Sequence, residues 1–118
     1  MLAVMQPIET WEGWCDGLRK TPKLILVEGE KDQQALARLE ITNTLTVAKK
    51  SPYKVIEEIC ARAREVIILT DLDREGKKYY AILKHHLQRN GVKIDTVFRE
   101  FLFHAKVTCI ESVKEDLF

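Results

Sequence analysis

The chain alternates short apolar runs with longer stretches in which apolar residues recur every three or four positions. Two of the runs, at residues 24–27 and 66–69, are uninterrupted. Such runs are typical of parallel strands that are buried on both faces. A shorter run at 45–47 predicts another strand, and alternating apolar and polar residues at 92–98 predict a less buried strand near an edge.

Helical spacing separates these strands. The first helix is predicted behind Thr10, a typical N-cap residue, and the second opens at Glu30. The third begins at Ser51-Pro52, because proline suits the first helical position, and the fourth covers 75–89 and closes at Asn90-Gly91. The residues expected on the buried faces are Trp11, Trp14, Cys15 and Leu18, then Ala35, Leu36 and Leu39, then Val55, Ile56, Ile59, Cys60 and Ala63, and finally Tyr79, Ile82, Leu83 and Leu87.

This order of elements predicts an α/β fold. We expect a four-stranded parallel sheet with helices on both faces, joined by right-handed crossovers, and with strand order 2-1-3-4. A length of 118 residues favours one domain over 1–118, with an N-terminal helical segment at 1–22, a core at 23–98 and a C-terminal tail at 99–118. In the tail the pattern predicts only an apolar stretch at 101–103 and one short helix at 110–117.

Composition narrows the function classes. The formal net charge is +1, so a nucleic-acid partner would have to be held by local patches rather than by a global field. Cys15, Cys60 and Cys109 are far apart, which argues against a disulfide framework or a zinc site and fits a reducing cytoplasm. Apolar runs are far below the ~20 residues that span a bilayer, and residues 1–5 lack the features of a secretory signal. We expect a cytoplasmic protein with no membrane partner.

Acidic residues follow two of the predicted strands. Glu28 comes directly after the first strand, while Asp71 and Asp73 come after the third, so all three belong to the carboxyl edge of one sheet. Carboxylates this close raise one another's pKa unless a cation neutralises them, and Mg²⁺ before Ca²⁺ is the natural counterion. The alternative is helix capping, because acids are favoured at helix N-termini, where four of the chain's acids stand: Asp73, Glu75, Glu30 and Asp32.

Two segments carry a family resemblance. L-V-E-G-E-K-D at 26–32 and I-L-T-D-L-D-R-E-G at 68–76 resemble the motifs of the Toprim domain, which is shared by type IA topoisomerases, bacterial primases, the 5S ribosomal RNA maturation nuclease and the overcoming-lysogenization-defect nucleases. The first segment is closest to the primase and RNA-nuclease form, and the second to the topoisomerase form. The resemblance covers about residues 23–98, implies a Toprim-like Rossmannoid fold, and is closest in size to the small stand-alone Toprim proteins of archaea and some bacteria.

The resemblance implies roles for individual acids. The position of Glu28 acts in the family as a general acid or base in making or breaking a phosphodiester bond. The positions of Asp71 and Asp73 hold Mg²⁺, or Mn²⁺ in its place, and make both aspartates catalytic candidates with Glu28. Glu28 itself and Glu75, which follows the arginine of the second motif, are further candidate metal ligands.

Three other motif positions match the family. Gly29 and Gly76 are small residues that would let the backbone approach a phosphate, and Asp32 matches the acid that ends the first motif. The topoisomerase nucleophile is a tyrosine of another domain, so the tyrosines here inherit nothing from it, and we assign them to packing.

Basic residues flank the same edge. Lys49, Lys50, Arg74 and Lys77 are candidates for contact with a nucleic-acid backbone, and the alternative for each is ordinary solvated charge. Lys49 and Lys50 are favoured, because their loop leaves the second strand beside the proposed site.

Two functional hypotheses follow. The first is a Mg²⁺-dependent enzyme that cleaves phosphodiester bonds or transfers nucleotidyl or phosphoryl groups on RNA or DNA, with a protein partner that supplies substrate grip. The alternative is a non-catalytic metal- and nucleic-acid-binding module within a larger complex. Glu28 favours the enzyme, since metal binding needs the aspartates but proton transfer needs the glutamate, whereas the small size of the chain favours the module.

Overall fold

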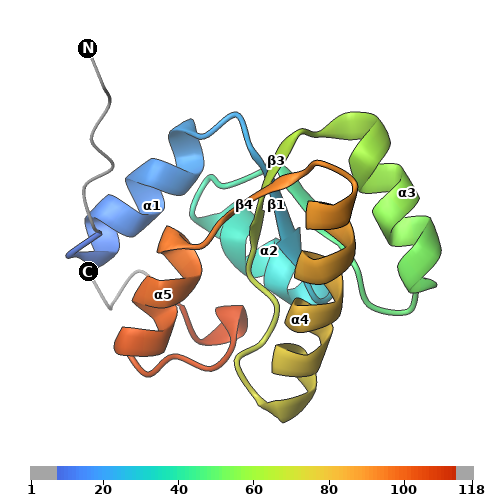
Figure 1. Ribbon diagram of the computed structural model, residues 1–118. Coiled ribbons are helices and arrows are strands. Elements are labelled where there is room, and N and C mark those ends of the chain that lie inside the picture. The colour runs from blue at the N-terminus through green and yellow to red at the C-terminus, as the bar shows by residue number, and fades with distance from the viewer. Residues whose placement is uncertain (1–7, 114–118) are drawn as a thin grey trace.

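Four parallel strands form the centre of the molecule. The computed structural model describes residues 8–113, and its strands are β1 (Leu24–Val27), β2 (Thr44–Thr46), β3 (Glu65–Ile68) and β4 (Lys93–Asp95). They are arranged in the order β2-β1-β3-β4, with β1 paired to β2 and β3. This confirms the predicted α/β fold and the predicted strand order. Strands β1, β3 and β4 are seen together at the centre of the fold in Figure 1.

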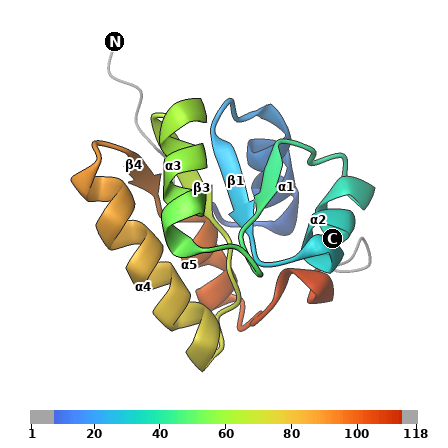
Figure 2. The same cartoon turned by 90° about the vertical axis from the view of Figure 1, so that its right-hand side faces the viewer.

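Helices cover both faces of the sheet. They are α1 (Trp11–Lys20), α2 (Glu30–Arg38), α3 (Pro52–Arg62), α4 (Arg74–Arg89) and α5 (Val97–His104), followed by a short 3-10 turn, η1 (Ile110–Ser112). Helices α1, α2 and α5 pack on one face, and α3 and α4 pack on the other (Figure 2). Several ends form as the sequence predicts: the Thr10 hydroxyl accepts a hydrogen bond from the Gly13 amide at 3.0 Å, and Pro52 begins α3.

Side-chain alternation along β1 divides the core between these two layers. Ile25 and Val27 point to the layer of α1, α2 and α5, whereas Leu24 and Leu26 point to the layer of α3 and α4. Because all four side chains are buried, an uninterrupted apolar run is what a central strand of this kind requires.

Two predicted core positions are wrong. Cys60 is exposed, so the buried stripe of α3 consists of Val55, Ile56 and Ile59 with Ala63 partly buried. Ile82 on α4 is 45% exposed, while Leu83 and Leu87 are buried. In both helices the face that meets the sheet is narrower than the apolar spacing suggested.

The predicted strand at 92–98 is also wrong beyond Asp95. The Asp95 carboxylate accepts a hydrogen bond from the Val97 amide at 3.0 Å, which turns the chain into α5. Phe98 is buried in that helix, where its ring lies so close to α1 that a side chain at Gly17 would meet it at 2.8 Å. Helix α5 was not predicted. Of the helix predicted at 110–117 the described residues form only η1, which ends at Ser112, and residues 114–118 lie outside the described part. Within residues 8–113 no helix has the length and apolarity needed to cross a membrane.

Candidate functional site

The carboxyl ends of β1 and β3 meet at the switch point of the sheet. Helix α2 leaves β1 over one face, and α4 leaves β3 over the other, so the two following loops diverge and leave room between them. Glu28 and Asp71 stand at this point, and the Glu28 Oε1 accepts a hydrogen bond from the Asp71 amide at 3.3 Å. Two acids that are 43 positions apart in the sequence are thus in contact, as the topology argument predicts.

Of these two acids, Asp71 has the more strongly raised pKa. Its Oδ1 is buried and has no hydrogen-bond partner among the described residues. Burial, followed by the negative charges of Glu28, Asp32 and Asp73, raises the pKa of Asp71 from its ordinary 3.8 to about 6. Burial also raises the pKa of Glu28, against the lowering effect of the Asp71 amide. A buried carboxylate oxygen without a donor is a place where a bound cation would relieve an unfavourable charge.

Asp73 and Asp32 both cap helices. The Asp73 Oδ1 accepts a hydrogen bond from the Gly76 amide at 2.7 Å, which makes Asp73 the N-cap of α4. The Asp32 Oδ2 accepts one from the Gly29 amide at 3.0 Å at the start of α2. The capping interpretation therefore holds for one oxygen of each residue. Glu75 is exposed on the first turn of α4.

The acidic side chains are suitable ligands for a divalent cation, but they are not preassembled into a metal site. Within residues 8–113 no three acidic, histidine or cysteine side chains are grouped so that they could hold a metal ion. Mg²⁺ does not require such a cage, because it commonly uses one or two carboxylates together with water and substrate phosphates. The unpartnered oxygen of Asp71 beside Glu28 fits that requirement, and Asp73 follows two residues later.

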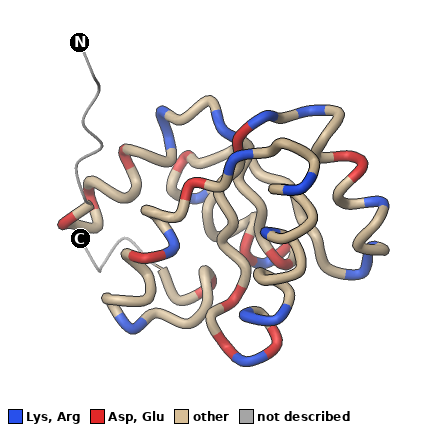
Figure 3. The backbone as a smooth tube through the Cα atoms, viewed as in Figure 1, with Lys and Arg blue, Asp and Glu red and all other residues tan. Residues whose placement is uncertain are grey.

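An open cleft of about 680 Å³ contains the acidic pair. Lys49 and Lys50 line it, as the sequence predicts, whereas Arg74 and Lys77 are exposed on α4 and do not line it. Five further lining residues were not predicted as part of the site: Glu30, Lys31, Thr46, Ala48 and Glu111. Glu30 and Lys31 lie inside the first motif and could have been found there, but Glu111 comes from the tail, where nothing in the sequence pattern indicates an approach to the cleft. Figure 3 shows both signs of charge distributed along the described residues 8–113, so any attraction for nucleic acid depends on local groups such as these lysines.

The fold itself requires a glycine at position 76. A Cβ atom at this position would overlap the backbone of Asp71, so α4 can start against the Asp71 loop only with glycine there. A Cβ at Gly29 would meet nothing within 4 Å. The close approach at Gly76 is therefore between two segments of this protein, and the proposed approach of a phosphate remains a prediction for both glycines.

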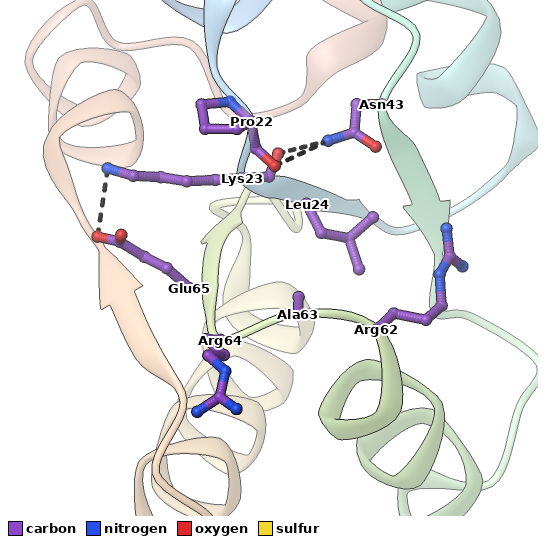
Figure 4. Close-up of a pocket in the computed structure, with 8 residues that line it drawn as sticks. All are labelled: Pro22, Lys23, Leu24, Asn43, Arg62, Ala63, Arg64 and Glu65. Carbon is purple, nitrogen blue, oxygen red and sulfur yellow. Dashed lines mark hydrogen bonds and ion pairs between the residues drawn. The ribbon is translucent and has the colours of Figure 1, made fainter.

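A second hollow, of about 280 Å³, lies at the opposite, amino edge of the sheet (Figure 4). There Lys23 pairs with Glu65 at 3.2 Å, and the Asn43 side chain donates to the Lys23 carbonyl at 2.7 Å. Arg62 and Arg64 line the same hollow. These residues lie at or just before the starts of β1, β2 and β3, so the hollow is separated from Glu28 and Asp71 by the length of the strands.

Replacing Asp71 by Asn is expected to stabilise the protein. The folded-state pKa of about 6 lies above the ordinary value, so the stability associated with the protonated carboxyl is lost as pH rises through 6. Partial exposure of Asp71 reduces this effect, and we expect the variant to melt about 4 °C higher at pH 7.5, or ~1 kcal/mol for a chain of this size. Below pH ~4, where the carboxyl is protonated in both states, the difference should vanish. Thermal melts over this pH range test the idea, and a lower melting temperature at pH 7.5 would contradict it.

Fold and site together define a class of protein: a doubly covered parallel sheet with a glutamate after its first strand and an aspartate pair after its third, in which the glutamate and the first aspartate meet at the switch point. Residues 23–102 match the Toprim domain family, and the chain belongs to it. The resemblance drawn from the two motifs is thereby confirmed, and the match extends into α5.

The chain is also similar to particular proteins. It is 34% identical to a UPF0292 protein of Methanocaldococcus jannaschii over 69% of this chain and 65% of that protein, and so spans just under two thirds of that relative. It is 33% identical to a UPF0292 protein of Pyrococcus abyssi over 92% of this chain and 81% of the relative. A solved structure of a protein from Aquifex aeolicus superposes with a TM-score of 0.85 at 30% identity, covering 90% of this chain and all of that one.

Proposed function

We propose that this protein is a Mg²⁺-dependent enzyme that cleaves or transfers phosphodiester bonds in RNA or DNA. The observation that carries the proposal is the contact of Glu28 with Asp71, whose buried Oδ1 has no partner in the described part of the chain. Membership of the Toprim family supports a metal-dependent role related to nucleic acid.

In this proposal each residue at the edge has a separate task. Asp71 and Asp73 hold the metal ion, with Glu28 and Glu75 as further candidate ligands, and the ion when bound neutralises negative charge on the phosphate. Glu28 moves the proton, because burial raises its pKa and lets it hold a proton closer to neutral pH than an ordinary glutamate. Lys49 and Lys50 contact the nucleic-acid backbone from the wall of the cleft. A protein partner supplies the remaining grip on the substrate.

The second candidate is a non-catalytic module that binds metal and nucleic acid within a larger complex. One observation favours it: residues 8–113 contain no preformed group of three metal-binding side chains, and weak binding of an ion suffices for a module but not for catalysis. In an enzyme of this type, substrate phosphates would have to supply the remaining metal ligands before catalysis. A non-catalytic module would not need these additional ligands.

Incubation with labelled substrates separates the two candidates. The purified protein is mixed with single- and double-stranded RNA and DNA in the presence of Mg²⁺ or Mn²⁺, and parallel samples contain a chelator. We expect cleavage or transfer with either metal and none with the chelator, because the carboxylates alone cannot offset charge on the phosphate. Binding without any metal-dependent change in the substrates would contradict the enzyme and support the module.

A further inference from the structure

Beneath the loop that carries Asp71 lies a buried cationic side chain. Arg99 of α5 is only 7% exposed. Its Nη1 donates hydrogen bonds to the Thr70 carbonyl at 2.5 Å and to the Thr70 hydroxyl at 3.2 Å, and its Nη2 donates to the Asp71 carbonyl at 3.2 Å. One guanidinium group thus holds the carbonyls of two consecutive residues, a geometry that suits the planar fork of arginine.

The charge of Arg99 has no carboxylate at ion-pair distance among the described residues. Instead, its guanidinium carbon lies 4.2 Å from the centre of the Tyr80 ring, and the charges of Glu28 and Asp71 act on it from further away. A buried cation is costly unless its surroundings compensate for it. Arg99 is therefore placed where backbone carbonyls and the acidic site together balance its charge.

The same loop is held from a second direction. Residues 69–73 belong to neither a helix nor a strand, and of their amides only that of Leu69 still bonds to a sheet carbonyl, that of Leu26 in β1 at 2.7 Å. The Leu72 amide donates to the Thr108 carbonyl at 2.7 Å, and Thr108 belongs to the segment that follows α5. Arg99 and Thr108 thus hold the loop from beyond position 98, in the segment that the sequence pattern placed in a tail, and they add to the bond between the Asp71 amide and Glu28.

We propose that Arg99 is a positioning residue: by clamping the carbonyls of Thr70 and Asp71, it fixes the direction in which the Asp71 carboxylate enters the cleft. The clamp itself is a property of the protein without metal. Its consequence for metal affinity rests on the proposed function, since it assumes that Asp71 is a ligand. Residues that orient a ligand from behind commonly change metal affinity by ~10- to 100-fold when they are replaced.

Arg99→Lys is the test variant, because lysine keeps the positive charge but cannot reach both carbonyls with one planar group. In the metal-free protein we expect the Leu72 and Asp71 amides to exchange hydrogen about tenfold faster in NMR experiments, while amides of β1 and β3 are unchanged. We also expect the affinity for Mn²⁺, measured by electron paramagnetic resonance, to fall about tenfold.

Arg19→Lys is the matched control. The Arg19 Nε also donates to a backbone carbonyl, that of Leu39 at 2.7 Å, but it does so at the end of α1, before β1 begins. This variant should change neither the two amides nor Mn²⁺ affinity. If Arg99→Lys fails to fold, Tyr80→Leu removes the ring beside the guanidinium without touching the loop, and should shift both measurements in the same direction by a smaller factor.

The outcomes separate the clamp from the function. If exchange at Leu72 and Asp71 in Arg99→Lys matches that of the parent, the clamp is wrong. If exchange is faster but Mn²⁺ affinity is unchanged, Arg99 stabilises the loop and does not position a ligand, which overturns the proposal. If the parent itself binds no Mn²⁺, the proposed function fails and with it the positioning role, whereas the exchange data still decide whether the clamp exists.

Discussion

Replacement of Glu28 by Gln is expected to lower any metal-dependent cleavage by at least ~10²-fold, within the ~10²- to 10⁴-fold range typical of general acid or base catalysis. Glutamine has the same shape and can still accept the hydrogen bond from the Asp71 amide, but it cannot give or take a proton. The fold and nucleic-acid affinity should therefore be retained, and Mn²⁺ affinity should fall far less than the cleavage rate, because Asp71 and Asp73 remain. Single-turnover cleavage rates, Mn²⁺ titration and nucleic-acid binding on the same samples provide the comparison.

Glu30→Gln is the matched control for this change. Glu30 lines the same cleft two residues further along the chain, but it is exposed at the start of α2. Its replacement removes one negative charge from the cleft without touching the Asp71 amide, so the cleavage rate should change by less than about threefold. Cleavage that survives undiminished in Glu28→Gln would show that the proton is moved by another group.

Much of this site could be predicted because parallel sheets place the ends of their strands at one edge. The uninterrupted runs at 24–27 and 66–69 identified the two central strands, and the acids directly after them had to meet if those strands were neighbours. The contact of Glu28 with Asp71 follows from this topology alone. Family motifs added the chemical roles, which the sheet geometry cannot supply.

Residues from the tail could not be predicted in the same way. Arg99 reaches Thr70 across 29 positions of sequence, and Glu111 enters the cleft from a short 3-10 turn. The apolar spacing around them does not mark either position, because a long-range contact by a single charged side chain leaves no periodic pattern. The alternation of apolar and polar residues at 92–98 led to a wrong prediction for a related reason. Phe98 is buried by packing against Gly17, and its side chain can be buried in this way from a helix as well as from a strand.

For Asp73, the capping and metal-binding interpretations of the sequence are compatible. One oxygen of Asp73 accepts from the Gly76 amide, and this contact fixes the side chain at the start of α4, next to the glycine that lets α4 approach Asp71. A capped aspartate is held in one orientation, which lowers the entropy lost when it binds an ion. Asp73 therefore contributes to the structure whether or not a metal is bound, while Asp71 has no such structural partner for its Oδ1 among the described residues.

The double variant Asp71→Asn with Asp73→Asn is expected to lose Mn²⁺ binding, with affinity falling more than ~100-fold. Changes behind a ligand already cost ~10- to 100-fold, and this variant removes the charge of two proposed ligands. Asparagine is as good an N-cap as aspartate, so α4 should keep its start, and the protein should melt no lower than the parent. Electron paramagnetic resonance titration with Mn²⁺ provides the measurement.

Two further variants make this result specific. Glu75→Gln removes an exposed acid from the first turn of α4 and should lower the affinity far less than the double variant. Of the two single changes, Asp71→Asn should have the larger effect, because Asp73 commits one oxygen to the helix cap whereas the Oδ1 of Asp71 has no partner in the described part of the chain. If the double variant bound Mn²⁺ as tightly as the parent, the ion would have to lie elsewhere, and the carboxyl edge would lose its proposed role.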